Sequence, residues 1–132
     1  MQTGVTIGPY RILRHLGSGG MGDVWLAEDT RLDRQVALKM VRAADTADEA
    51  SRTRLRREAR AAAALNHPHI ATVHDVIESD GQVVIVFEYV EGETLHDMLR
   101  RGPLPAPAAV GIATQIARAL VAAHSHGIVH RD

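Results

Sequence analysis

A glycine-rich segment and a solitary lysine are the two features of this 132-residue sequence that point most directly to chemistry. The segment Gly17-Ser18-Gly19-Gly20-Met21-Gly22 has the spacing G-x-G-x-x-G, in which glycines let backbone N–H groups approach phosphate oxygens. Lys39 is the only lysine beside fourteen arginines, and it follows the apolar residues Val36-Ala37-Leu38. A compact ammonium can reach between phosphates in a tight pocket where a planar guanidinium cannot. These residues predict a site for a phosphorylated ligand. The alternative is that the single lysine was retained by chance and has no such role.

The residues after the glycines distinguish the known phosphate-binding loops. A dinucleotide-binding fold requires a helix directly after the loop, and a Walker loop requires Lys followed by Ser or Thr. Here the loop is followed by Asp23-Val24-Trp25-Leu26-Ala27, which is typical of a strand. Both of those folds are therefore disfavoured. Two alternatives stay open: a flap between antiparallel strands that covers phosphates, or a plain glycine hairpin.

A carboxylate on the apolar side of a predicted helix supplies a partner for the lysine. At 100° per residue, Leu55 and Ala62 fall within about 60° of Glu58 on the helical wheel. Glu58 is therefore expected to face the sheet, where a lone buried carboxylate is costly unless a cation meets it. This argument predicts a Lys39–Glu58 ion pair. An exposed pair between Glu58 and Arg54 is the alternative.

The elements that position these residues follow from periodicity and turn chemistry. Apolar and alternating runs predict five strands, over residues 10–16, 23–29, 35–41, 71–78 and 82–90, the last two joined by the hairpin turn Ser79-Asp80-Gly81. A helix over 48–65 is inserted after the third strand. A short helix over 95–101 and a longer one between Pro105 and Gly127 follow. The predicted fold class is α+β: a five-stranded antiparallel sheet with one helix, followed by helices alone.

Composition narrows the class of protein further. The net charge of −1 argues against a nucleic-acid partner, and the absence of cysteine excludes disulfides and cysteine-based zinc sites. The eight histidines are expected to form no metal site, because those close in sequence point to different faces. The apolar stretches are expected to be too short to span a bilayer, and no signal pattern opens the chain. A soluble, cytoplasmic domain is therefore expected.

Taken in order, these residues resemble the signature motifs of protein kinases. The matching segments are Leu16-Gly17-Ser18-Gly19-Gly20-Met21-Gly22-Asp23-Val24, Val36-Ala37-Leu38-Lys39, Glu58, Asn66-His67-Pro68, Phe87-Glu88-Tyr89-Val90 and His130-Arg131-Asp132. The Gly-Gly-Met-Gly tip of the loop looks most like bacterial Ser/Thr kinases of the eukaryotic-like type. The resemblance implies a kinase N-terminal lobe over residues 1–90 and the start of a helical C-terminal lobe over 91–132.

The resemblance also implies roles for individual residues. Lys39 would contact the α- and β-phosphates of ATP, Glu58 would orient Lys39, and Asp132 would accept the proton of the substrate hydroxyl. Phe87 would lie behind adenine, with the Glu88 carbonyl and the Val90 amide at the adenine edge. The full set implied to bind ATP is Leu16, Gly17, Ser18, Gly19, Gly20, Met21, Gly22, Val24, Ala37, Lys39, Phe87, Glu88 and Val90.

The cofactors implied are ATP and Mg²⁺, and the partner implied is a protein substrate bearing Ser or Thr. The resemblance also permits pairing between two such kinase lobes. No metal ligand is predicted within this chain, because the motifs that hold magnesium in the family lie beyond Asp132.

The match to the kinase pattern stops at Asp132, before the catalytic-loop Asn, the Asp-Phe-Gly motif and the activation loop. We therefore expect a truncated piece of an ATP-dependent Ser/Thr protein kinase that is inactive alone. The alternative is a non-catalytic lobe that binds nucleotide or docks on a partner kinase. Membrane tethering through a downstream segment stays open. The DNA downstream of codon 132 distinguishes these hypotheses.

Overall fold

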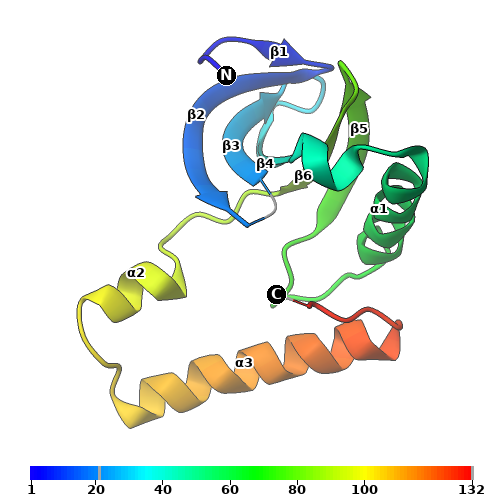
Figure 1. The fold of residues 1–132 in the computed structure, drawn as a ribbon. Coiled ribbons are helices and arrows are strands. Elements are labelled where there is room, and N and C mark those ends of the chain that lie inside the picture. The colour runs from blue at the N-terminus through cyan, green and yellow to red at the C-terminus, as the bar shows by residue number, and fades with distance from the viewer. Residues whose placement is uncertain (21, 132) are drawn as a thin grey trace.

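A curled antiparallel sheet carries one helix on its outer side, and a helical arm follows its last strand along the chain (Figure 1). The computed structural model describes residues 1–20 and 22–131. The sheet order is β1-β2-β3-β4-β6-β5. The strands are β1 Thr6–Ile7, β2 Tyr10–Gly19, β3 Gly22–Asp29, β4 Arg34–Val41, β5 Val73–Ser79 and β6 Gln82–Glu88. The helices are η1 Ala43–Thr46, α1 Glu49–Ala63, α2 Leu95–Arg100 and α3 Ala106–Ser125.

The predicted α+β class is confirmed, as are all five predicted strands and three helices. Two elements were not predicted. Strand β1 has only two residues, which pair with Tyr10 and Arg11, and it is too short to show any alternation. The single 3₁₀ turn η1 lies in a polar stretch without apolar periodicity.

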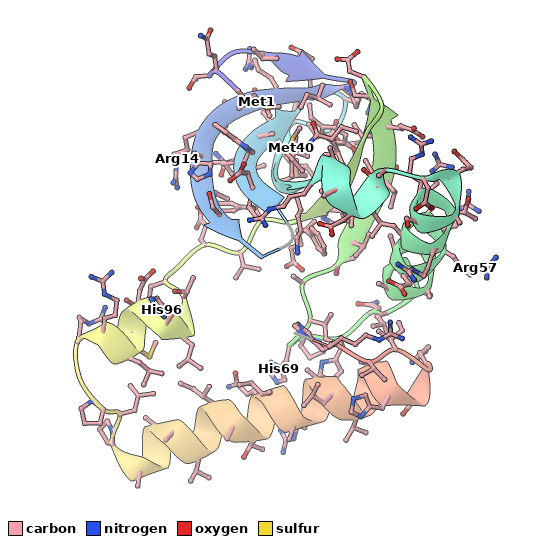
Figure 2. The ribbon with its side chains drawn as sticks, viewed as in Figure 1. Met1, Arg14, Met40, Arg57, His69 and His96 are labelled. Atoms are coloured by element: carbon pink, nitrogen blue, oxygen red, sulfur yellow. The ribbon has the colours of Figure 1, made fainter. Side chains whose placement is uncertain are left out.

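The sheet buries a different apolar cluster on each face. Inside the curl lie nine buried side chains, with Trp25 and Ile77 packed against them: Ile7, Tyr10, Ile12, Ala27, Val36, Leu38, Met40, Val84 and Val86. Figure 2 shows Met40 within this curl. On the other face, Val41, Val73 and Ile85 pack against Ala59 of α1. Because β4 and β6 contribute to both clusters, they are buried on both sides and hold the sheet together.

Helix α1 begins where the sequence predicts. The carboxylate of Asp48 caps it by accepting a hydrogen bond from the backbone N–H of Ser51 at 2.7 Å. Leu55, Ala59 and Ala62 face the sheet, and Ala59 is buried. The arginines project outward, as Figure 2 shows for Arg57.

Helix α3 corrects one expectation from the sequence. Its 20 residues, Ala106–Ser125, are long and apolar enough to cross a membrane by length and composition alone. The sequence had suggested that no stretch was long enough, but alanines between the larger apolar residues extend the run. Val110, Ile116, Leu120 and Val121 are exposed on this helix. Core helices of larger folds satisfy the same criterion, because they too are apolar on most sides.

A polar network ties the first and last parts of the sheet together. The hydroxyl of Tyr10 donates to Asp75 on β5 at 2.9 Å, and the guanidinium of Arg31 donates to the Tyr10 hydroxyl at 3.1 Å. Arg31 also donates to the buried Asp29 from its backbone N–H at 3.0 Å. Burial alone would raise the pKa of Asp29, but the hydrogen bonds from Arg31 outweigh it and lower that pKa. Burial and the bond to Asp75 raise the pKa of Tyr10 to about 12.

A close backbone contact fixes the end of the glycine segment on β4. Gly22 pairs with Val41 and has φ of 142°, a conformation that favours glycine. A Cβ built on Gly22 would lie 1.8 Å from the carbonyl oxygen of Met40. Gly17, by contrast, has open space around such an atom. A side chain at Gly22 is therefore sterically excluded by the neighbouring strand, whereas one at Gly17 is not.

We predict that Gly22→Ala lowers the free energy of unfolding by about 3 kcal/mol, because it combines backbone strain with a clash against a main-chain atom. Gly17→Ala is the matched control and should change it by less than about 1 kcal/mol. Urea denaturation followed by circular dichroism measures both values. Equal stabilities for the two variants would contradict the packing described at Gly22.

The raised pKa of Tyr10 predicts a loss of stability at high pH. Because the folded state holds this proton more tightly than the unfolded state, the contribution is present below pH 10 and is lost as the pH rises through about 12. Urea denaturation between pH 9 and 12 measures it. Tyr10→Phe should remove this pH dependence and Tyr89→Phe should keep it. A dependence that survives in Tyr10→Phe would assign it to another group.

Candidate functional site

Strand register brings four of the predicted site residues onto one face of the sheet. Val24 on β3 lies opposite Lys39 on β4, and Ala37 lies opposite Phe87 on β6. Residues paired across strands, and residues two apart along a strand, point to the same side. Val24, Ala37, Lys39 and Phe87 therefore share the face opposite the cluster inside the curl.

The glycine segment forms the end of the β2–β3 hairpin, as the sequence predicts. Gly17 pairs with Val24, Ser18 with Asp23 and Gly19 with Gly22. Met21, another predicted site residue, lies outside the described residues. Ser18, Gly19 and Gly20 are exposed at the tip, so their backbone is accessible to a ligand. The hairpin prediction is confirmed, and its second strand, β3, pairs with the strand that carries Lys39.

A β-bulge accompanies Leu16. The register of β2 against β3 shifts between His15 and Gly17, which leaves Leu16 without a cross-strand partner. Bulges bend a strand and re-aim its side chains, often beside active sites. Sequence alternation alone did not predict this bulge, because a single extra residue leaves the apolar pattern nearly unchanged.

Polar side chains join the two strands of the hairpin below its tip. The Ser18 hydroxyl donates to the carboxylate of Asp23, and the imidazole Nε2 of His15 lies 3.5 Å from the same carboxylate. The hydrogen bond from Ser18 lowers the pKa of Asp23. The ring of His15 also meets that of Trp25, the single tryptophan, edge to face at 4.7 Å. These contacts join the flap to the sheet.

Lys39 is half-buried on its strand. Among residues 1–20 and 22–131, no hydrogen bond or ion pair engages its ammonium. An ammonium held on a partly buried face without a counter-charge favours an anionic ligand, because burial of an unpaired cation is costly.

The predicted Lys39–Glu58 ion pair is not formed in this structure. The Glu58 side chain is 55% exposed, and its carboxylate lies 3.7 Å from Arg131 rather than against Lys39 or Arg54. The wheel argument failed because the contact face of α1 is centred on Leu55, Ala59 and Ala62, which places Glu58 at its edge. A carboxylate at that edge stays hydrated and does not need the buried cation.

Arg131 approaches Glu58 from the last described part of the chain. Its backbone has φ of 62°, a left-handed conformation that few residues other than glycine adopt. Asp132, the predicted catalytic residue, lies outside the described residues. The structure therefore brings the segment before Asp132 back to α1, but it does not describe Asp132 itself.

The predicted adenine-binding segment follows β6. Phe87 is half-buried against the cluster beneath α1, and Glu88 is held by its backbone N–H, which donates to the Thr72 carbonyl at 2.8 Å. Val90 is 64% exposed, and within the described part of the chain no hydrogen bond engages its backbone amide. That amide is free to bind a ligand.

A cavity in the described part of the chain includes residues of this segment in its lining. Its volume is about 330 Å³, and its lining combines residues near the hinge with the inner side of α3: Pro68, His69, Ile70, Ala71, Glu88, Val90, Ile112, Gln115 and Ile116. Neither the glycine segment nor Lys39 lines it. This cavity therefore shares Glu88 and Val90 with the predicted site but does not enclose the flap or Lys39.

Two contacts at the site were not predicted from the sequence. The guanidinium of Arg42 donates to the carbonyl of Gly19 at the flap tip at 2.9 Å, and Arg131 meets Glu58. Arg42 follows β4 directly, and only this position next to a predicted strand could have suggested from the sequence that Arg42 lies near the site. Within the described residues no group of three or more His, Asp or Glu side chains could hold a metal ion.

Within the described residues, the arrangement offers an exposed backbone at the tip of the flap, an unpaired ammonium on the neighbouring strand β4, and an unbonded amide at Val90. A flat apolar ring could lie against Val24 and Ala37, with its attached anionic groups toward Lys39. This combination suits a nucleotide with phosphates.

Comparison with known proteins agrees with this arrangement. The protein kinase domain family matches residues 10–132. The Mycobacterium tuberculosis Ser/Thr-protein kinase PknE is 49% identical over 130 residues, which are 98% of this chain and 23% of PknE. Mycobacterium bovis PknH is 47% identical over 132 residues, which are 99% of this chain and 22% of PknH.

Solved structures extend the agreement to three dimensions. A crystal structure of the M. tuberculosis PknI kinase domain superposes with a TM-score of 0.87 at 41% identity, covering 100% of this chain and 54% of that chain. Helix α3 thus has a counterpart inside a kinase domain. The chain spans less than a quarter of the length of PknE and PknH. By motif order, fold and sequence identity, the chain belongs to the protein kinase domain family.

Proposed function

We propose that this chain is the nucleotide-binding part of an enzyme that transfers phosphate from ATP to Ser or Thr of proteins. The observation that carries the proposal is the ammonium of Lys39, which has no partner among residues 1–20 and 22–131 and lies on the same sheet face as Val24 and Ala37. A triphosphate would supply the missing counter-charge. The Ser/Thr preference is supported by relatives such as PknE, which are Ser/Thr-protein kinases.

Each residue of the site has a distinct role in the proposal. Flap amides cover the phosphates, Lys39 binds the α- and β-phosphates, and the Val90 amide donates to the adenine edge. Asp132 accepts the proton of the substrate hydroxyl and aims its oxygen. Residues 1–90 form the N-terminal lobe and 91–132 begin the C-terminal lobe.

Magnesium belongs to the proposed reaction, but the described residues do not fit it. No cluster of carboxylates or histidines in 1–20 and 22–131 could hold the ion. We therefore derive no step through magnesium. Three further proposals rest on the family resemblance: a protein substrate, a cytoplasmic location and the pairing of two lobes.

A second candidate function is a lobe that binds nucleotide without chemistry. The observation favouring it is that Glu58 pairs with Arg131, while Lys39 has no ion-pair partner in the described part of the chain, so the Lys39–Glu58 pair needed for transfer is not assembled. Nucleotide binding is common to both candidates. Phosphoryl transfer by the polypeptide encoded by the whole reading frame separates them.

We predict that Lys39→Ala weakens ATP binding about 10- to 100-fold, the loss that corresponds to one charge-assisted hydrogen bond. Adenosine, which has no phosphates, should bind the variant and the wild-type chain equally. Fluorescence titration of the single tryptophan, Trp25, measures the affinity for both ligands.

In the full reading-frame product, Asp132→Asn should reduce phosphoryl transfer at least about 100-fold and keep ATP affinity. Wild-type protein that binds no ATP would refute the proposed function.

Glu58→Gln should separate stability from catalysis. Because the Glu58 side chain is 55% exposed and its ion pair with Arg131 is long, at 3.7 Å, its loss should change the free energy of unfolding by less than about 0.5 kcal/mol. Transfer by the full reading-frame product should nevertheless fall if Glu58 orients Lys39 during the reaction. Denaturation and a phosphotransfer assay test both statements. Unchanged transfer would remove Glu58 from the proposed mechanism.

A further inference from the structure

We propose that Arg42 is a positioning residue that latches the tip of the glycine flap and so presets it over the phosphates of the nucleotide. Its guanidinium Nη2 donates to the carbonyl of Gly19 at 2.9 Å. The proposal that the latch acts on phosphates rests on the proposed nucleotide-binding function. The latch itself rests on contacts within the chain.

The main chain at Arg42 is anchored on both sides. The carbonyl of Val41 accepts a hydrogen bond from the Gln82 side chain at 3.2 Å. The carbonyl of Arg42 accepts from the backbone N–H of Asp45 at 3.0 Å and from the hydroxyl of the buried Thr46 at 3.4 Å. The guanidinium therefore extends from a fixed base, and η1 supplies half of that base.

The flap, in contrast, has little else to hold its tip. Ser18, Gly19 and Gly20 are exposed, and glycine backbones have more conformational freedom than those of other residues. The polar contacts of Ser18 and His15 converge on Asp23, below the tip. In the described part of the chain, Arg42 provides the only side-chain hydrogen bond to the main chain of Gly19 and Gly20.

The charges around Arg42 would let it hydrogen-bond the flap and attract an anion at the same time. The negative charge of Asp23 lies near enough to Arg42 for the cation to lower the pKa of that carboxyl, after the larger effects of Ser18 and His15. Donating to one carbonyl leaves further guanidinium donors unused, since arginine has five N–H groups. Arg42 can thus keep its bond to Gly19 while its positive charge faces bound phosphates.

The energetic reason for a latch is preorganisation. A flap that samples many conformations must lose that freedom when ATP binds, and this loss weakens binding. A flap already held by Arg42 loses less. The effect should appear for ligands that contact the flap through phosphates and not for those that contact only the apolar face.

The experiment compares Arg42→Ala with Arg34→Ala, a matched control at the opposite, exposed end of β4. Hydrogen exchange of the peptide covering residues 17–22 is measured without ligand, and Trp25 fluorescence gives the affinities for ATP and adenosine. Arg42→Ala should speed flap exchange about fivefold and weaken ATP about fivefold, the loss typical of one hydrogen bond. Arg42→Lys should recover part of both effects, and Arg34→Ala should match wild type.

The outcomes separate the latch from the proposed function. Unchanged flap exchange in Arg42→Ala overturns the latch, whatever the nucleotide affinity. Faster exchange with unchanged ATP affinity overturns its role toward phosphates, as does an equal loss of ATP and adenosine affinity. Wild-type chain that binds no ATP defeats the proposed function alone, since the exchange measurement still decides the latch.

Discussion

The hairpin that carries the glycine segment is constrained by a close approach of two backbones where the segment ends. At Gly22 the main chain of β3 lies against the Met40 carbonyl of β4, and any Cβ would collide with that oxygen. The same pair of strands places Val24 opposite Lys39. Apolar burial on both faces of β4 and β6 then keeps the contact in place. The site is a consequence of this register.

Two cations of the site, Lys39 and Arg131, differ in their contact with the carboxylate of Glu58. One carboxylate, Glu58, lies within reach of Arg131 at the edge of α1, and Lys39 is left without a partner among the described residues. Both cations would gain from the same carboxylate, so moving it from one to the other is a small energetic change at a hydrated surface. A bound triphosphate would add negative charge next to Lys39 and alter this balance.

Most of the fold was predictable because its signals are local. The alternating or continuous apolar runs of β2 to β6, the Asp48 cap of α1 and the Asp80-Gly81 turn each act within a few residues. The misses have a common cause: β1, the bulge at Leu16 and the turn η1 involve too few residues to give a pattern. The wheel for Glu58 failed for another reason. A helical wheel gives relative angles, and only the sheet determines which angle is inward.

The sequence by itself determined the kinase motifs, their order and the residue types that could bind a nucleotide, because those depend on composition and spacing along the chain. Tertiary structure alone decided which charges meet. Arg42 reaches Gly19, and Arg131 reaches Glu58, across 23 and 73 residues of chain respectively. Ion pairs and hydrogen bonds depend on distances of a few ångströms between side chains, and such distances between remote segments exist only once the sheet has curled and α1 has packed on it.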